Sequence, residues 1–331
     1  MRTRPLGPFT VSAIGLGCMN MSAGYGAADP EESERVLQQA LDSGYRLLDT
    51  AAVYGAGHNE SLIGNTLASR RHEFVLATKC GMGRDAAGLP CPSGRPERLR
   101  QECEASLRRL RTEVIDLYYL HRVDPAVPVE ESIGALGELV REGKVQTLGL
   151  SEVCCDTLRR AHREHPITAV QSEYSLWSRT PERGMLDCCS ELGVTFVAFA
   201  PLGRGFLTGK AGDITTLAAD DIRQTIARPR FEPDAFAANS RLLPPFGAIA
   251  ERVGCSPAQL ALAWLLHRDE GRILPIPGTK HRDYLLENAA AAEVTLDGAS
   301  VAELDQLINE QTVRGERYSD SIMQSIDAER D

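Results

Sequence analysis

The chain has 331 residues, of which 43% are apolar and 25% are charged, and its formal net charge is -10. This composition is ordinary for a globular protein that buries its own core. The acidic balance argues against nucleic-acid binding, which needs a basic surface. No stretch approaches the ~18 apolar residues of a membrane span, and the first residues, MRTRPLGPF, lack the apolar run of a signal peptide. We therefore expect a cytoplasmic protein that binds neither nucleic acid nor membrane.

Nine cysteines, an odd number that includes two adjacent pairs, are spread along the chain. They form no CxxC motif and no Cys/His group at the spacing of a zinc site. This pattern predicts reduced thiols, as in cytosolic proteins, and no bound metal.

Short apolar strands alternate with amphipathic helices in the first part of the chain. A hairpin is predicted over Met1–Val11 and a strand over Ala13–Leu16. Asp29 is expected to cap a helix that carries Pro30 in its first turn and ends at Gly44. The same alternation then predicts strands over Arg46–Leu48, Phe74–Thr78 and Val114–Leu120, with helices over Asn59–Ser69 and from Pro96 onward.

The alternation continues to about residue 292. Two segments depart from it: Lys210–Ala237 is long and rich in Asp and Pro, which is typical of a functional or disordered loop, and the last twenty residues are polar and predict a tail on the surface. The remaining predicted elements are helices near Glu130–Glu142, Cys155–His165, Glu182–Leu192, between Ser240 and His267 and near Arg282–Ala292, and strands over Gln146–Leu150, Thr168–Val170, Thr195–Phe199 and Ile273–Ile276.

Eight strands, each followed by helix, make up this pattern. Strands that alternate with helices form a parallel sheet, and eight such units in about 280 residues favour a closed barrel over an open sheet. We therefore predict a fold of the α/β class: one (β/α)₈ TIM-barrel domain over residues 1–331, with an N-terminal β-hairpin, extra C-terminal helices and a polar tail from about residue 311 to 331.

Polar side chains follow three consecutive predicted strands. Asp49 and Tyr54 come after the second strand, Lys79 after the third and His121 after the fourth. A lone Lys or His at a strand end is most often a solvated or structural residue. All four, however, fall on the rim where (β/α)₈ barrels place their chemistry. The joint pattern therefore predicts a catalytic group made of Asp49, Tyr54, Lys79 and His121.

The four residue types suit the reduction of a carbonyl. A free tyrosine has a pKa of ~10, and a lysine cation beside the phenol is expected to lower the pKa of Tyr54. Asp49 would keep Lys79 charged and in place, and His121 offers a donor that orients the carbonyl oxygen or relays a proton. The set predicts Tyr54 as the general acid that protonates an oxygen while its carbon accepts a hydride.

The motifs around these residues resemble those of the aldo-keto reductases: DTAAVYG with Tyr54, ATK with Lys79 and LH with His121. The resemblance continues through GLSE (149–152), QSEYSLW (171–177), FAPLGRGFLTGK (199–210) and PIPGTKHRDYLLEN (275–288), and so covers about residues 5 to 310. It implies a (β/α)₈ barrel that binds NADPH without a Rossmann domain, and an NADPH-dependent reduction of aldehydes or ketones.

The resemblance also implies where the cofactor lies. Ser151 and Gln171 would hold the nicotinamide carboxamide, and Phe199 would stack on the nicotinamide ring. The backbone of Leu202–Gly205 would follow the pyrophosphate, since glycines allow N–H groups to approach phosphates. Thr279 and Lys280 would meet the 2′-phosphate, and Glu287 and Asn288 would hold the adenine. The complete set of implied cofactor contacts is Met19, Ser151, Gln171, Phe199, Leu202, Gly203, Gly205, Gly278, Thr279, Lys280, Glu287 and Asn288.

Two positions differ from the commonest family pattern: Glu152 replaces an Asn, and Phe199 replaces a Tyr. Glu152 would weaken the carboxamide contact or leave it to its neighbours, and Phe199 keeps the aromatic ring. Trp177 is expected either to line the substrate pocket or to pack, and Cys80, next to Lys79, reads as a small buried residue or as a redox-sensitive thiol.

Two other functions stay open at this stage. Lys79 at a strand end would also suit an aldolase that forms a Schiff base, and a non-catalytic NADPH-binding regulatory subunit would keep the same residues. The physiological substrate, the direction of the reaction, the oligomeric state and the strictness of the preference for NADPH over NADH are not readable from the sequence, because they depend on loop shapes and surfaces.

Overall fold

The computed structural model describes residues 1–84, 90–210, 214–268, 272–324 and 326–330. Its centre is an eight-stranded parallel sheet in the order β12-β11-β10-β9-β8-β5-β4-β3. The strands of this sheet are β3 (Leu16–Gly17), β4 (Leu47–Asp49), β5 (Val75–Cys80), β8 (Ile115–Leu120), β9 (Val145–Ser151), β10 (Ile167–Glu173), β11 (Thr195–Phe199) and β12 (Ile273–Pro275). Because neighbours in the sheet follow one another along the chain, the predicted succession of parallel strands is confirmed.

The two outer strands of the sheet meet and close it into a barrel. Gly17 forms a parallel bridge with Gly278, and the Gly17 N–H donates to the carbonyl oxygen of Pro277 at 3.2 Å. A Cβ atom at Gly17 would lie 2.8 Å from the carbonyl oxygen of Ile276, so the seam of the barrel requires a glycine at this position. The strand expected over Ala13–Leu16 is in fact the two-residue β3, displaced toward this seam.

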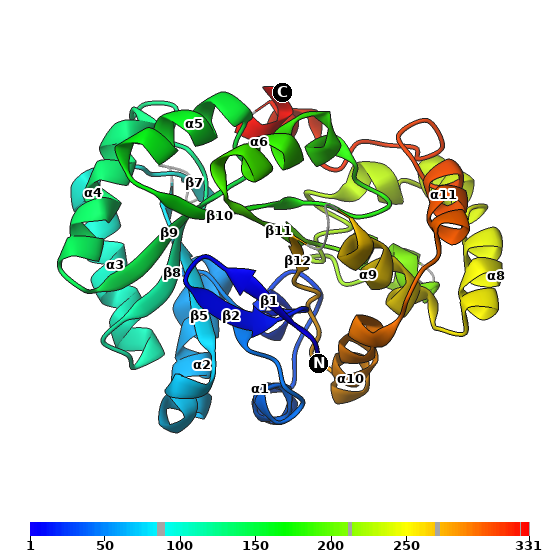
Figure 1. Cartoon of the computed structure of the whole chain (residues 1–331), viewed down its shortest axis with the longest axis horizontal. Helices are drawn as coiled ribbons and strands as arrows, with labels where there is room; N and C mark the ends of the chain where they lie inside the picture. The colour runs from blue at the N-terminus through cyan, green and yellow to red at the C-terminus, as the bar shows by residue number, and fades with distance from the viewer. Residues whose placement is uncertain (85–89, 211–213, 269–271, 325, 331) are drawn as a thin grey trace.

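Helices surround the sheet (Figure 1). The predicted cap of the first helix is confirmed: the Asp29 side chain accepts from the Glu32 N–H, and Pro30 begins the helix. The helices are α1 (Pro30–Asp42), α2 (His58–Leu67), α3 (Pro96–Leu110), α4 (Val129–Arg141), α5 (Cys155–Glu164), α6 (Met185–Leu192), α7 (Pro233–Ser240), α8 (Leu243–Val253), α9 (Pro257–His267), α10 (Arg282–Ala290), α11 (Gly298–Leu307) and α12 (Asp320–Met323). No helix of the described ranges has both the length and the apolar character needed to cross a membrane.

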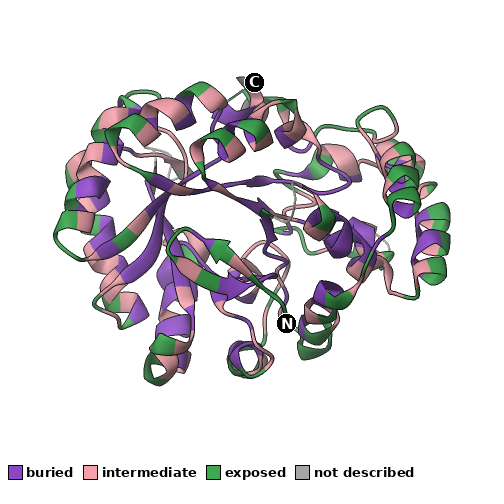
Figure 2. Cartoon of the chain, in the orientation of Figure 1, coloured by how far each residue is buried: buried purple, intermediate pink, exposed green. Residues whose placement is uncertain are grey.

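Two hydrophobic layers hold these elements together. The larger lies between the sheet and the helices, and the smaller fills the inside of the barrel with Leu47, Leu117, Tyr119 and Val197, among others. Leu6 and Val11 join the inner layer; they come from the antiparallel hairpin of β1 (Thr3–Leu6) and β2 (Phe9–Ser12). The strands are accordingly buried along most of their length, whereas the helices are exposed on their outer faces (Figure 2).

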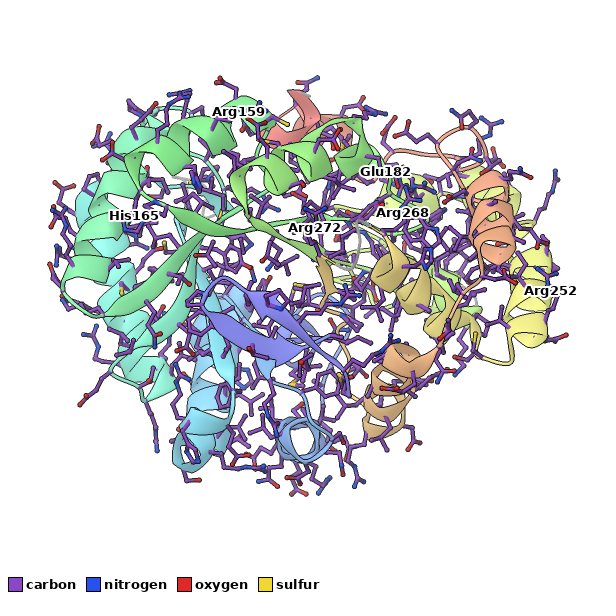
Figure 3. The ribbon with its side chains drawn as sticks, viewed as in Figure 1. Arg159, His165, Glu182, Arg252, Arg268 and Arg272 are labelled. Carbon is purple, nitrogen blue, oxygen red and sulfur yellow. The ribbon has the colours of Figure 1, made fainter. Side chains whose placement is uncertain are left out.

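An ion-pair group ties the segment after β10 to the end of α9 and to α11, which follow β11 and β12. Arg268, directly after α9, pairs with Glu182 and with Asp305 of α11, each at 3.2 Å. Arg179 also pairs with Glu182, at 2.6 Å, and with Asp305, at 3.1 Å. Figure 3 shows Glu182 and Arg268 side by side between these elements. Segments that are distant in the chain are thereby tied together beside the sheet.

The segment after β11 contains short helices where an irregular loop was expected. Ile214–Thr216 and Arg228–Phe231 are 3-10 helices, and α7 begins at Pro233. A second hairpin, of β6 (Met82–Arg84) and β7 (Pro90–Pro92), follows β5. Neither feature has the apolar periodicity that marks helices and strands in the sequence.

The C-terminal segment is packed into the protein, although its polarity predicts a surface tail. Arg317, Tyr318, Ile326, Asp327 and Ala328 are all buried. The Ala328 N–H donates to the carbonyl oxygen of Glu152 at 3.2 Å, next to the carboxyl end of β9. The expectation of a surface tail is therefore wrong for these residues, because Arg317 is buried in ion pairs with Glu152 and Glu329 and Asp327 accepts from the Cys154 N–H.

Candidate active site

A cavity of about 510 Å³ opens at the carboxyl ends of the barrel strands. Asp49, Tyr54 and His121 line one part of it, and Lys280 and Asn288 line another. The cavity thus joins the predicted catalytic group to most of the residues expected to hold the cofactor. Its position is the one at which (β/α)₈ barrels carry their active sites.

Three of the four predicted catalytic residues form one hydrogen-bonded group. Lys79 Nζ donates to Asp49 Oδ1 at 2.5 Å, to the Thr50 carbonyl oxygen at 2.8 Å and to the Tyr54 hydroxyl at 3.3 Å. The Lys79 side chain is fully buried and is not on the cavity wall, whereas its partners Asp49 and Tyr54 are. All three ammonium protons therefore have an acceptor, and the ammonium ion is held behind the tyrosine.

The backbone after β4 turns sharply to bring Tyr54 over Lys79. Tyr54 begins a 3-10 turn in which Gly55, Ala56 and Gly57 all have positive φ angles, of 57°, 53° and 91°. Glycine adopts these angles without the steric cost that other residues bear, which explains the two glycines of the YGAG segment. The turn directs the Tyr54 hydroxyl toward both the Lys79 ammonium and the cavity.

Burial and charge act in opposite directions on this group. Burial raises the pKa of Tyr54, and the nearby Lys79 lowers it by less, so the net pKa lies above that of a free phenol. Lys79 thus lowers the pKa of Tyr54 as expected, but burial, which the sequence does not reveal, outweighs it. Burial acts to lower the pKa of Lys79, but Asp49 and Tyr54 together outweigh burial and raise it. The site therefore holds a protonated phenol beside a lysine that stays charged.

His121 stands at the end of β8 with its ring at the edge of the Tyr54 ring. The ring centroids are 5.9 Å apart and nearly perpendicular. Burial, followed by the positive charges of Arg122 and Lys79, holds the pKa of His121 well below its usual value. His121 Nδ1 is buried without a hydrogen-bond partner among the described residues. A neutral imidazole ring therefore lies against the Tyr54 ring on the wall of the cavity.

The residues expected at the nicotinamide lie next to this group. Ser151, Gln171, Phe199 and Met19 all line the cavity. Gln171 Nε2 donates to Asp49 Oδ2 at 2.8 Å, which fixes the amide and leaves its carbonyl oxygen available as an acceptor. An amide, a hydroxyl and an aromatic face are thus gathered beside Asp49.

The residues expected at the phosphates and the adenine line the rest of the cavity, with one exception. They are Leu202, Gly205, Gly278, Thr279, Lys280, Glu287 and Asn288, whereas Gly203 is not on the wall. A Cβ at Gly203 would lie 2.9 Å from the Trp177 ring, so that glycine serves packing. Lys280 Nζ donates to the carbonyl oxygens of Tyr25 and Ala27, at 2.9 and 2.6 Å, so its cation is bound to the loop after β3.

Glu152 points away from the cavity. Its carboxylate is buried, accepts from the Glu173 N–H at 2.9 Å and pairs with Arg317 Nη2 at 2.6 Å. Glu173 in turn pairs with Arg204 at 2.6 Å, and Arg204 lines the cavity. The acid that departs from the family pattern therefore anchors the C-terminal segment, and its side chain does not compete for the carboxamide.

Trp177 and Cys80 belong to the packing. Trp177 does not line the cavity but stacks on Phe206 at a centroid distance of 4.2 Å. The Cys80 thiol is buried, and burial raises its pKa well above the usual value, which opposes the thiolate chemistry of redox-sensitive cysteines. No metal-binding group of three or more His, Cys, Asp or Glu side chains occurs in the part of the chain that the structure describes.

Several cavity residues had no place in the sequence interpretation, among them Tyr25, Arg122, Arg223 and Tyr318. Arg122 could have been found, because it directly follows His121. The other three lie on segments without regular periodicity, and Tyr318, in the C-terminal segment, carries no motif.

Comparison with known proteins agrees with the site. Residues 13–309 match the model of the aldo/keto reductase family. The chain belongs to the aldo/keto reductase family. This aldo/keto reductase is therefore an oxidoreductase that acts on carbonyl groups with a nicotinamide cofactor, and the family resemblance and the (β/α)₈ fold expected from the sequence are confirmed.

Solved structures of similar proteins cover nearly the whole chain. A glycerol dehydrogenase from Gluconobacter oxydans is 30% identical, with a TM-score of 0.83 over 93% of this chain and 94% of that one. An aldo-keto reductase from Bacillus halodurans in its holo form is 27% identical, with a TM-score of 0.73 over 97% and 99%. An aldo/keto reductase from Klebsiella pneumoniae in complex with NADP and acetate is 27% identical, with a TM-score of 0.69 over 94% and 95%.

Proposed function

We propose that this protein is an NADPH-dependent reductase of aldehydes or ketones in which Tyr54 is the general acid. The observation that carries the proposal is the Tyr54 hydroxyl on the cavity wall, 3.3 Å from the buried Lys79 ammonium. A phenol whose pKa is raised keeps its proton at neutral pH, so it is available to a carbonyl oxygen that becomes negative. The adjacent cation then stabilises the phenolate left behind.

The residues present fit a nicotinamide dinucleotide. Bound NADPH supplies a hydride to the carbonyl carbon. Ser151 and Gln171 would hold the carboxamide, Phe199 would lie against the ring, and Thr279 and Lys280 would meet the 2′-phosphate. The acceptor on Gln171, the cation on Lys280 and the glycine at position 205 suit an amide, a phosphate and a close backbone approach. The Klebsiella relative was solved with NADP, which supports the same cofactor here.

The chain's own residues complete the reduction by one proton transfer. Tyr54 gives its proton to the carbonyl oxygen, while the His121 ring beside it provides the second donor that orients this oxygen. Asp49 holds the Lys79 ammonium in place at 2.5 Å. The products are an alcohol and a tyrosinate that regains its proton from solvent.

The geometry argues against the alternative of a Schiff-base aldolase. An amine nucleophile must lose its proton and reach the substrate carbonyl. Lys79 is buried, lies outside the cavity lining, and has its pKa raised. A regulatory subunit would have the same contacts, so turnover separates it from a reductase.

The test is the variant Tyr54→Phe. We expect the rate of NADPH-dependent aldehyde reduction to fall by about 10²–10⁴-fold, the usual contribution of a general acid, while the dissociation constant for NADPH, followed by fluorescence quenching, changes less than about threefold. Tyr174→Phe is the matched control, since it removes a hydroxyl that bonds to Glu182 away from the cavity. Reduction at the wild-type rate by Tyr54→Phe, or an inactive wild-type protein that binds NADPH, would overturn the proposal.

A further inference from the structure

Arg122 lies at the catalytic end of the cavity and the reaction described above does not use it. It follows His121 directly after β8, and it lines the cavity together with Tyr54 and Ser151. Its positive charge is close enough to contribute to the lowered pKa of His121. A guanidinium group therefore stands where the substrate must approach the acid.

Among the described residues, the bonds of this guanidinium are made by one nitrogen, Nη1. Arg122 Nη1 donates to the His121 carbonyl oxygen at 2.6 Å and to Ser151 Oγ at 3.1 Å. These two bonds use both hydrogens of Nη1. Arg122 Nε and Nη2 donate to no acceptor among the described residues. Two parallel N–H groups along one edge are the geometry with which arginine binds a carboxylate or phosphate bidentately.

The other cations of the cavity wall differ from Arg122, because three of them form ion pairs and the fourth, Lys280, is assigned above to the 2′-phosphate of the cofactor. Arg204 pairs with Glu173 at 2.6 Å, Arg223 with Asp221 at 2.7 Å and Lys210 with Glu287 at 3.6 Å, and Lys280 is bound by backbone carbonyls. Across residues 1–84, 90–210, 214–268, 272–324 and 326–330, Arg122 has no carboxylate within ion-pair distance.

The rest of the catalytic group does not balance this charge. Lys79 and Asp49 neutralise one another, and His121 and Tyr54 are uncharged at neutral pH because the pKa of the first is lowered and that of the second is raised. One positive charge thus remains at the catalytic end, on a side chain that is half-buried. A partly desolvated guanidinium whose Nε–H and Nη2–H groups are unpaired attracts an oxyanion more strongly than a guanidinium on the surface does.

We propose that Arg122 binds an oxyanion of the substrate, so that the preferred substrates are aldehydes or ketones that also carry a carboxylate or a phosphate group. This inference rests on the proposed carbonyl reduction and specifies its substrate class. The Nε–Nη2 edge of Arg122 receives the anion while Tyr54 and His121 receive the carbonyl oxygen. Arg122 is a specificity residue in this assignment, and the proton transfer remains with Tyr54.

The competing role for Arg122 is to position Ser151 for the cofactor. That role affects charged and neutral substrates equally, because both use the same cofactor. The ratio of kcat/KM between an anionic substrate and its neutral counterpart therefore isolates the proposed role. Suitable pairs are 4-oxobutanoate and its methyl ester, 4-carboxybenzaldehyde and its methyl ester, and glyceraldehyde 3-phosphate and glyceraldehyde; the first two probe a carboxylate and the third a phosphate.

The wild-type protein is expected to prefer the anionic member of at least one pair by about tenfold or more, the value of a hydrogen bond to a charged group. Arg122→Gln should remove most of that preference by raising the KM for the anionic substrate. Arg122→Lys, which keeps the charge but loses the pair of parallel N–H groups, should retain part of it. Ser151→Ala serves as the matched control, since it breaks the bond to Arg122 Nη1 and should leave the ratio unchanged while the KM for NADPH rises.

A binding measurement gives a readout independent of turnover. The dissociation constant of terephthalate, an unreactive dicarboxylate, is measured by calorimetry with NADP⁺ present and should rise about tenfold in Arg122→Gln. Two results would refute the role of Arg122 while leaving the proposed carbonyl reduction intact. One is that neutral aldehydes are reduced and no pair shows a preference for its anionic member; the other is that Arg122→Gln leaves the ratio of kcat/KM between the two members unchanged. Absence of turnover for every aldehyde, neutral ones included, would refute the proposed function and this inference with it.

Discussion

Replacing Arg317 should destabilise the protein strongly, because its side chain neutralises buried acids. Arg317 pairs with Glu152 and Glu329, each at 2.6 Å, and lies 3.5 Å from Glu173. The side chains of Arg317 and Glu152 are 5% and 0% exposed. Glu173 keeps Arg204 when Arg317 is lost, whereas the Glu152 carboxylate is left, within the described part of the chain, with the Glu173 N–H as its donor. Arg317→Met therefore leaves a buried charge without its partner.

The size of the effect follows from this geometry. Removing one partner of a buried ion pair costs about 3–5 kcal/mol. An unfolding entropy of about 2.1 cal/mol/K per residue gives roughly 0.7 kcal/mol/K for a chain of 331 residues. We therefore expect Arg317→Met to lower the Tm by about 4–7 °C, measured by circular dichroism at pH 7.

A double-mutant cycle shows whether the lost pair is the cause. Glu152→Gln keeps the shape of the side chain and removes its charge, so the double variant Arg317→Met/Glu152→Gln should be destabilised by less than the sum of the single changes, with a coupling of about 1–3 kcal/mol. Arg35→Met is the control, because its pairs with Glu31 and Glu32 lie on the surface. A Tm of Arg317→Met within 1 °C of the wild type, or strictly additive effects, would contradict the reasoning.

Three further results are expected. Buried Glu173 has a pKa of about 2, because Arg204, Arg317 and Arg230 outweigh the opposing effect of burial. Since its folded-state pKa is depressed, the stability that Glu173 contributes should be full above about pH 4.5 and be lost as the pH falls toward 2. Glu173→Gln should therefore make the unfolding free energy depend less on pH in this range, as followed by circular dichroism. Lys280→Ala should raise the KM for NADPH by about tenfold or more relative to the KM for NADH; an unchanged ratio of the two would assign the 2′-phosphate to another residue. Gly17→Ala places a Cβ 2.8 Å from the Ile276 carbonyl oxygen and should cost about 1–3 kcal/mol of unfolding free energy in urea, whereas the control Gly247→Ala, in open space on α8, should not destabilise.

The regular part of the fold was predictable because its signal is local. Asp29 before Pro30 marks the start of α1, and apolar runs such as Val114–Leu120 correspond to buried strands. The strand at the seam was misplaced, because β3 is defined by what Gly17 meets on the other side of the barrel. A pairing between the two ends of the chain has no local signature.

The candidate site was predictable as a set of residues but not as an electrostatic environment. Asp49, Tyr54, Lys79 and His121 follow strand ends, and the parallel topology brings such positions to one rim. The direction of the pKa shift of Tyr54 was not predictable, since burial opposes Lys79 and sequence does not give the depth of burial. The burial of Arg317 was missed for a related reason: Glu152 and Glu173, its partners, lie more than 140 positions away in the sequence.

The cavity lies at the seam where the barrel closes. The first and last strands of the sheet meet there through the bridge between Gly17 and Gly278 and through backbone hydrogen bonds from Gly15 to Pro275 and from Gly17 to Pro277. Residues from both sides of this bridge line the cavity. Any ligand that fills the cavity touches both ends of the sheet at once. A ligand that binds the closed barrel and not an opened one would stabilise this closure by mass action.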